Sequence, residues 1–293
     1  MISITKKSLR ELANNDWDQT LITINFRKID YLSRVAETAI NFPNFSYLVK
    51  PCWELKQQVA FWIYCSALAF QFWELDIDGG LKKYCYGNMT GSTAMFRCLR
   101  DNWIDGELPL SDVSYVLSNS PNSNMRIEIA IELSSEKKKL YEIAEILIAR
   151  ATRGQVSVSD ASLLVDAFPK SFSDPYLKKA QLALTAIASL VYESMGVPVN
   201  CDLTALADYQ VPRVLRALGI IEYSPKLATL VDNQIELEVN GCLERAIRAA
   251  TIVSVENIAN RFNRPEVIID NILWQSQDLA KSTKFHLTQT TFY

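Results

Sequence analysis

The sequence predicts a mostly α protein that forms a single compact domain over residues 1–293, with a minor β element near residues 75–90. Apolar residues recur at helical spacing over 134–196 and 242–282. Only nine glycines occur among 293 residues, which favours helices over many tight β turns. Apolar residues make up 49% of the chain, enough for a sizeable core. Neither an internal repeat nor a Gly/Ser linker divides the sequence.

The first third of the chain combines helical and ambiguous patterns. Apolar spacing over 6–41 predicts helix. The aromatic and apolar stretch 53–73 fits either a buried helix or a strand and a turn, because periodicity does not separate the two. Asp78-Gly79-Gly80 predicts a turn, and Leu81–Tyr86 a short strand after it.

The remaining segments read as a series of helices. The expected helices lie at 92–104, 112–117, from Ser134, from Ser159 to about Pro169, from Pro175 to Gly196, 242–262 and from Pro265. Ser118–Asn124 is a loop by composition, and the tail 285–293, rich in Thr and aromatic residues, is expected to be extended.

The stretch 207–219 places one acid at the start of a short helix. Asp208 lies just before the first turn, where a carboxylate accepts hydrogen bonds from unpaired backbone N–H groups. Pro212 suits the first turn of a helix, and Gly219 suits its left-handed end. On this stretch alone, a helix cap is the favoured interpretation of Asp208.

Composition excludes several classes of function. A net charge of −3 argues against direct, stable nucleic-acid binding but permits a small anionic ligand. The six cysteines form no C-x-x-C pair, and the single histidine, His286, completes no metal cluster. We therefore expect no metal and no cofactor.

The sequence also indicates a compartment. No secretory signal is visible, and the longest apolar run, Val59–Phe70, is too short to span a bilayer. We expect a cytoplasmic protein without membrane association, and its oligomeric state is left open.

Several short motifs occur in a fixed order from about residue 60 to the end. They are Phe70-Gln71-Phe72-Trp73, Thr90-Gly91, Phe168-Pro169-Lys170-Ser171-Phe172-Ser173-Asp174, Lys178-Lys179-Ala180-Gln181, Ala207-Asp208-Tyr209-x-x-Pro212, Tyr223-Ser224, the helix with Glu244, Arg248 and Glu256, Asp270-x-x-Leu273-Trp274 and Phe285-His286. This order resembles the queuosine salvage family, whose members hydrolyse queuosine 5′-phosphate to free queuine, the base used in tRNA modification.

The resemblance implies roles for two acids. Asp208 matches the catalytic Asp of the family, which stabilises the positive charge that builds on the ribose or orients a water. Asp270 is the expected acceptor for N–H donors of a 7-deazaguanine base. We expect both carboxylates to converge on one cleft, with at least one of Trp73, Phe172 and Trp274 in its wall.

Other positions complete the expected substrate-binding set, and three of them depart from the family. Tyr209 follows the catalytic Asp, and the 5′-phosphate needs donors, for which Lys179 is a candidate beside Lys178, Arg213 and Arg248. Leu206 replaces a ligand-binding Phe, Asn271 a Tyr and Gln275 an Asp. These replacements imply altered contacts with the base.

The leading hypothesis is thus a hydrolase that cleaves the N-glycosidic bond of a small nucleotide. A non-catalytic helical protein that holds a nucleobase or nucleotide in the same pocket is the alternative. A helical architecture like that of DNA glycosylases is also compatible, since Leu215-Arg216-Ala217-Leu218-Gly219-Ile220 resembles a helix-hairpin-helix edge. The acidic balance argues against a DNA-repair enzyme.

Overall fold

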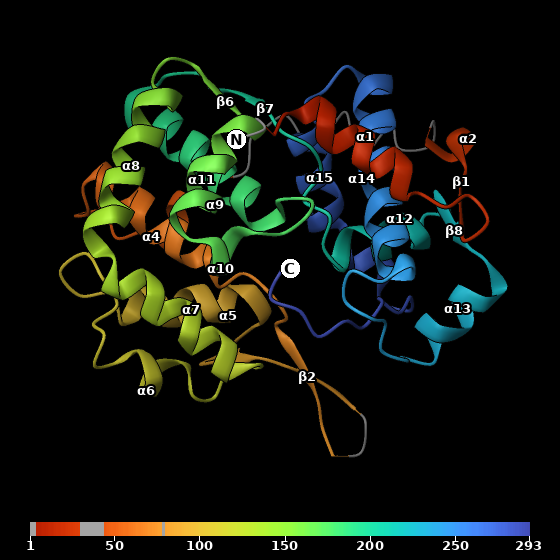
Figure 1. Cartoon of the computed structure of the whole chain (residues 1–293), viewed down its shortest axis with the longest axis horizontal. Coiled ribbons are helices and arrows are strands. Elements are labelled where there is room, and N and C mark those ends of the chain that lie inside the picture. Colours follow the sequence, from red (N-terminus) through yellow and green to blue (C-terminus); the bar gives the residue numbers. More distant parts are fainter. Residues whose placement is uncertain (1–3, 30–43, 78–79) are drawn as a thin grey trace. The chain divides into compact units, whose positions relative to one another are not determined.

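The structure, a computed structural model, describes residues 4–29, 44–77 and 80–293. Helices make up most of it and the strands are short, so the mostly α fold class is confirmed (Figure 1). Contacts group the chain into two compact units. Unit 1 comprises Met1–Pro43, Ser157–Ser159 and Cys201–Thr290, and unit 2 comprises Asn44–Val156, Asp160–Asn200 and Thr291–Tyr293. That residues 1–293 form a single domain stays a prediction.

Unit 2 is built around two buried helices, α4 and α11. Its elements are the 3-10 helix η2 (Ser46–Leu48), α4 (Leu55–Ala67), β2 (Trp73–Leu75), β3 (Leu81–Lys83), β4 (Cys85–Tyr86), β5 (Met89–Thr90), α5 (Gly91–Asp101), α6 (Val113–Leu117), α7 (Ser123–Ser135), α8 (Lys137–Ala151), α9 (Ala161–Ala167), α10 (Pro169–Phe172) and α11 (Lys178–Met195). α4 packs against both α11 and α8. Three short elements contain the points at which the chain passes from one unit to the other: β6 (Gln155–Ser157), η3 (Val158–Asp160) and β7 (Asn200–Asp202).

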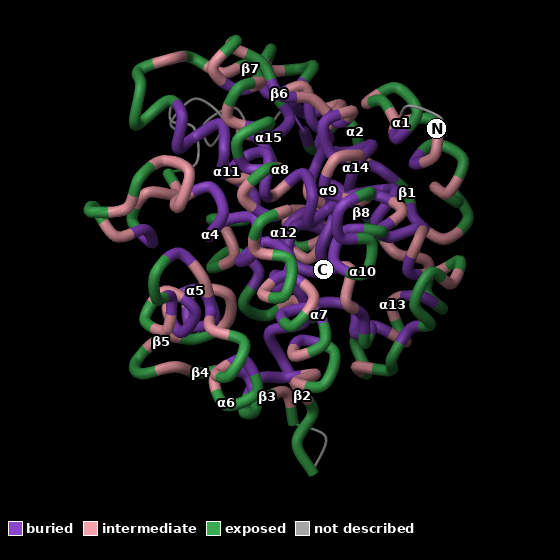
Figure 2. Tube along the Cα trace, turned by 60° about the vertical axis from the view of Figure 1, so that its left-hand side comes forward, coloured by how far each residue is buried: buried purple, intermediate pink, exposed green. Residues whose placement is uncertain are grey.

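The ambiguous segment 53–73 is a helix followed by a strand. A capping box starts α4, in which Gln57 accepts a hydrogen bond from the Glu54 backbone N–H at 3.2 Å. Residues 59–67 of this helix are all buried, which explains why its sequence lacks an amphipathic period (Figure 2). Strand β2 then pairs antiparallel with β3, in the register Trp73↔Lys83. The minor β element near 75–90 is therefore confirmed, while Asp78 and Gly79 of the predicted turn lie outside the described residues.

Unit 1 is organised around the long helix α14 (Cys242–Phe262), which packs against α1, α12 and α15. The other elements are α1 (Lys6–Asp16), β1 (Ile22–Ile24), α2 (Phe26–Ile29), α12 (Gln210–Ala217), β8 (Ile221–Tyr223), α13 (Pro225–Asp232), α15 (Glu266–Gln275) and the 3-10 helix η4 (Ser276–Ala280). Among the residues that the structure describes, none of the helices is both long and apolar enough to cross a membrane.

The prediction of helix throughout 6–41 is wrong at β1. α1 ends at Asp16, and the Asp18 carboxylate accepts a hydrogen bond from Thr20 N at 2.8 Å in a tight turn. Ile22–Ile24 then pairs antiparallel with β8, in the register Ile22↔Tyr223. The β-branched run Ile-Thr-Ile suits a strand once this distant partner is present. The rest of the predicted helix, residues 30–43, lies outside the described residues.

The helix expected from Ser134 is α8, which begins at Lys137, and another helix, α7, precedes it where no helix was predicted. α7 already begins at Ser123, inside the segment predicted as a loop, and α8 follows after Glu136. α7 buries Arg126, Ile129, Ala130 and Leu133, so a charged residue interrupts the apolar pattern that would reveal it. In the tail, Leu287 forms a parallel bridge with Glu236.

Candidate functional site

Asp208 caps helix α12, as predicted. Its Oδ1 accepts hydrogen bonds from Gln210 N at 2.7 Å and from Val211 N at 3.1 Å. The residue is only 7% exposed, and its carboxylate lies at the positive end of the helix dipole. These local bonds hold the carboxyl group in one orientation.

Asp270 lies on α15 and reaches the same segment of chain. Its Oδ1 accepts a hydrogen bond from Leu206 N at 2.9 Å, and the residue is 4% exposed. Both acids are thus bonded to the backbone between Leu206 and Val211, one from α15 and one from within the segment. This brings Asp208 and Asp270 together locally, while the cleft and its aromatic wall stay predictions.

A third bond to this segment comes from α14. The Nε of Arg248 donates to the carbonyl oxygen of Ala207 at 2.9 Å. Arg248 is fully buried and forms an ion pair with Glu244, also fully buried, with 3.5 Å between Arg248 Nη1 and Glu244 Oε1. A side chain buried in this way does not suit the phosphate-binding role considered for Arg248. Sequence reasoning missed the pair, although the i,i+4 spacing of Glu244 and Arg248 is a signal for it.

Phe285, in the tail, contacts the segment, and His286 follows it in the sequence. The ring of Phe285 lies 4.8 Å from that of Tyr209, the residue after Asp208, measured between centroids. His286 is buried, and burial, with a smaller contribution from Arg248, lowers its pKa to about 3. His286 is therefore neutral near pH 7, in agreement with a structural role.

The depressed pKa of His286 predicts a loss of stability in acid. The unfolded imidazole takes up a proton below pH 6.5, whereas the folded one resists protonation down to about pH 3. Stability that is present above pH 6.5 is then lost as the pH falls through this window, by about 2 kcal/mol between pH 7.5 and pH 5. Urea unfolding at both pH values measures the change. His286→Gln should remove this part of the pH dependence, and an identical dependence in the variant would contradict the assignment.

The exposed side of α15 carries two of the positions that depart from the family. Asn271 is half-buried and Gln275 is exposed. The Gln275 Nε2 donates to Asn271 Oδ1 at 3.4 Å, one helical turn apart. Trp274 is 37% exposed and lies one turn after Asp270. Leu206, half-buried, offers its backbone N–H to Asp270 and leaves part of its apolar side chain accessible.

Three predicted site residues belong to unit 2. Trp73, Phe172 and Lys179 are all buried there. The Nζ of Lys179 donates to the Ala67 carbonyl oxygen at 2.9 Å and lies 4.9 Å from the centre of the Phe70 ring. Burial, the largest cause, lowers the pKa of Lys179 well below its ordinary value. The role of these three residues in substrate binding remains a prediction.

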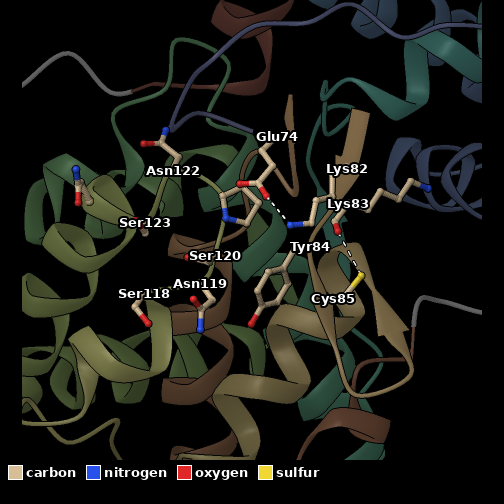
Figure 3. Close-up of a pocket in the computed structure, with 12 residues that line it drawn as sticks. Glu74, Lys82, Lys83, Tyr84, Cys85, Ser118, Asn119, Ser120, Asn122 and Ser123 are labelled. Carbon is tan, nitrogen blue, oxygen red and sulfur yellow. Dashed lines mark hydrogen bonds and ion pairs between the residues drawn. The ribbon is translucent and has the colours of Figure 1, made fainter. Parts of the chain in front are cut away.

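Unit 2 also contains a polar pocket of about 700 Å³ (Figure 3). Strands β2 and β3 supply one side, where Lys82 Nζ lies 3.2 Å from the Glu74 carboxylate. The segment Ser118–Asn124, predicted as a loop, supplies the other side. None of the predicted site residues lines this pocket.

Comparison with known proteins identifies the family. The family model for queuosine salvage protein matches residues 170–293. A queuosine 5′-phosphate N-glycosylase/hydrolase of Sphaerobacter thermophilus is 30% identical over 222 residues, which cover 64% of this chain and 67% of the relative. Relatives with the same name occur in Dictyostelium discoideum, 29% identical over 197 residues, and in Bos taurus, 24% identical over 278 residues.

These relatives are N-glycosyl hydrolases by name, and the resemblance to the queuosine salvage family is confirmed. The chain belongs to the queuosine salvage protein family. Its match covers 59% of the length of the Dictyostelium relative and 81% of the length of the bovine one.

Proposed function

We propose that this protein hydrolyses the N-glycosidic bond of a queuosine-type nucleoside 5′-phosphate and releases queuine or a related 7-deazaguanine for tRNA modification. One observation carries the proposal within this family. The two acids that match the family pattern, Asp208 and Asp270, are both bonded to the backbone of residues 206–211.

Asp208 is the proposed catalytic residue. As the C–N bond breaks, its electron pair moves to the base and positive charge builds on the ribose. A carboxylate beside the anomeric carbon stabilises that charge and orients the attacking water. The water oxygen forms the new C–O bond, and the proton that the water loses balances the one that the departing base takes up on its nitrogen. Because two backbone N–H groups hold Oδ1, the second oxygen of Asp208 has a defined direction before substrate binds. Such preorganisation lowers the cost of reaching the transition state.

Asp270 is proposed to recognise the leaving base. The base presents N–H donors on one edge, and a carboxylate is an acceptor with several lone-pair sites. One oxygen of Asp270 already accepts from Leu206 N, which orients the carboxyl group toward the Asp208 segment. In this arrangement recognition of the base and charge stabilisation at the ribose occur side by side.

Release of free base under single-turnover conditions tests the proposal. We expect the wild-type protein to release the base from queuosine-type 5′-nucleotides and to leave guanosine 5′-phosphate, which has a purine base, largely intact. Calorimetric binding of the same nucleotides runs beside the assay. Binding without release from any queuosine-type nucleotide would refute the enzyme and support the non-catalytic binding protein.

The replaced positions predict altered use of queuosine 5′-phosphate. Leu206, Asn271 and Gln275 stand where the family resemblance implies an aromatic ring, a phenol and a carboxylate. A site discriminates by orders of magnitude when polar groups lose their partners. We expect slower release from queuosine 5′-phosphate than a relative carrying the family residues achieves. The measurement is the ratio of kcat/KM for the two proteins, and equal values would contradict the prediction.

A further inference from the structure

The peptide unit between Ala207 and Asp208, which precedes α12, is hydrogen-bonded to a side chain of another helix, α14. A peptide unit is planar, so the carbonyl oxygen of Ala207 and the N–H of Asp208 lie in one rigid plane. The bond from Arg248 Nε to the Ala207 oxygen, at 2.9 Å, therefore restricts the rotation of the unit that ends at the Asp208 Cα. The orientation of that unit sets the position of the Asp208 Cα, and the bonds from Gln210 N and Val211 N then hold the carboxyl group attached to it.

Arg248 is itself held in place. It is the seventh residue of α14, a helix of 21 residues, and is fully buried. Glu244, one turn earlier and equally buried, supplies an opposite charge 3.5 Å away. Burying a guanidinium is costly without a partner, and the pair lowers that cost. The neutral His286 adds no further positive charge near Arg248 at pH 7.

We propose that Arg248, oriented by Glu244, is a positioning residue for Asp208. Arg248 acts through the Ala207 carbonyl and has no direct part in bond cleavage. This inference rests on the proposed function, because the carboxylate that it positions is the proposed catalytic group. Its consequence is specific: weakening the Arg248 bond should lower the rate of the chemical step and leave binding of the ground-state nucleotide nearly unchanged.

Arg248→Lys is the principal test. The lysine keeps the charge beside Glu244 but has no planar fork, so it does not satisfy the Ala207 oxygen and Glu244 in the same geometry. We expect the single-turnover rate of base release to fall roughly 10- to 100-fold, the scale of a small misplacement of a reacting group. The Kd for the nucleotide should change by less than about threefold, since the interaction matters in the transition state.

Arg245→Lys is the matched control, because Arg245 lies on the same helix and forms its ion pair with Asp16. We expect its rate to equal that of the wild type.

A double-mutant cycle distinguishes a positioning role from an effect on stability alone. In an Asp208→Asn background, Arg248→Lys should change the rate by no more than about twofold, because the two residues act as one unit. An additive loss would overturn the inference.

Release by the wild type is measured first. If the wild type releases no base, the proposed function fails and the inference fails with it. If the wild type is active and Arg248→Lys matches it, the inference alone is refuted. Should Arg248→Lys yield no folded protein, Glu244→Gln replaces it, with the same assays and the same expected loss of rate at unchanged affinity. A Glu244→Gln rate equal to that of the wild type would then refute the inference.

Discussion

Asp208→Asn should lower the single-turnover rate of base release by roughly a hundredfold or more, the scale of losing one positioned electrostatic or acid–base group. Asparagine keeps the oxygen that accepts hydrogen bonds from Gln210 N and Val211 N, so helix α12 retains its cap. What the variant loses is the negative charge, which is needed once the ribose becomes cationic. Calorimetric affinity for the nucleotide should change much less, because the charge develops only in the transition state.

Asp18→Asn serves as the control for this experiment. Asp18 also accepts a backbone hydrogen bond, from Thr20 N at 2.8 Å, but in an exposed turn of unit 1. Its substitution should leave the rate of release unchanged. An Asp208→Asn rate equal to that of the wild type would remove Asp208 from the mechanism, whereas a variant that loses affinity and rate in proportion would indicate a binding role.

Asp270→Asn should have its main effect on affinity. The amide oxygen can still accept from Leu206 N, so the local structure is kept, but an NH₂ group takes the place of the second carboxylate oxygen. The N–H edge of the base then faces a donor. Hydrogen bonds to charged groups contribute about 1.5–3 kcal/mol, so the Kd of the nucleotide should rise roughly 10- to 100-fold.

Isothermal titration with wild type and Asp270→Asn measures this change. Asp278→Asn is a suitable control, because Asp278 is largely exposed and forms a surface ion pair with the neighbouring Lys281. Affinity unchanged in Asp270→Asn would exclude Asp270 from recognition of the base. A fall in the rate with no change in Kd would instead assign Asp270 to the chemical step.

The sequence alone determined what depends on near neighbours in the chain. The helical period identified α8, α11, α14 and α15, because each presents apolar residues at i, i+3 and i+4 to a core. The capping role of Asp208 was also predictable, since it bonds to backbone groups only two and three residues away. The order of the short motifs was sufficient to indicate the family.

Tertiary structure decided the contacts that join distant residues. β1 was predicted as helix because its partner, β8, lies about two hundred residues further along the chain. The hydrogen bond between Asp270 and Leu206 joins residues that are 64 positions apart in the sequence, and the bond between Arg248 and Ala207 joins residues 41 positions apart. A local sequence period does not predict such pairs. They form when the packing of α14 and α15 brings their side chains to the 206–211 segment. Because a buried polar group without a hydrogen bond costs free energy, burial there favours each of these bonds. The sequence was therefore sufficient to predict the two acids. Only the folded structure of unit 1 shows that both are hydrogen-bonded to one backbone segment and that Arg248 is bonded to the same segment.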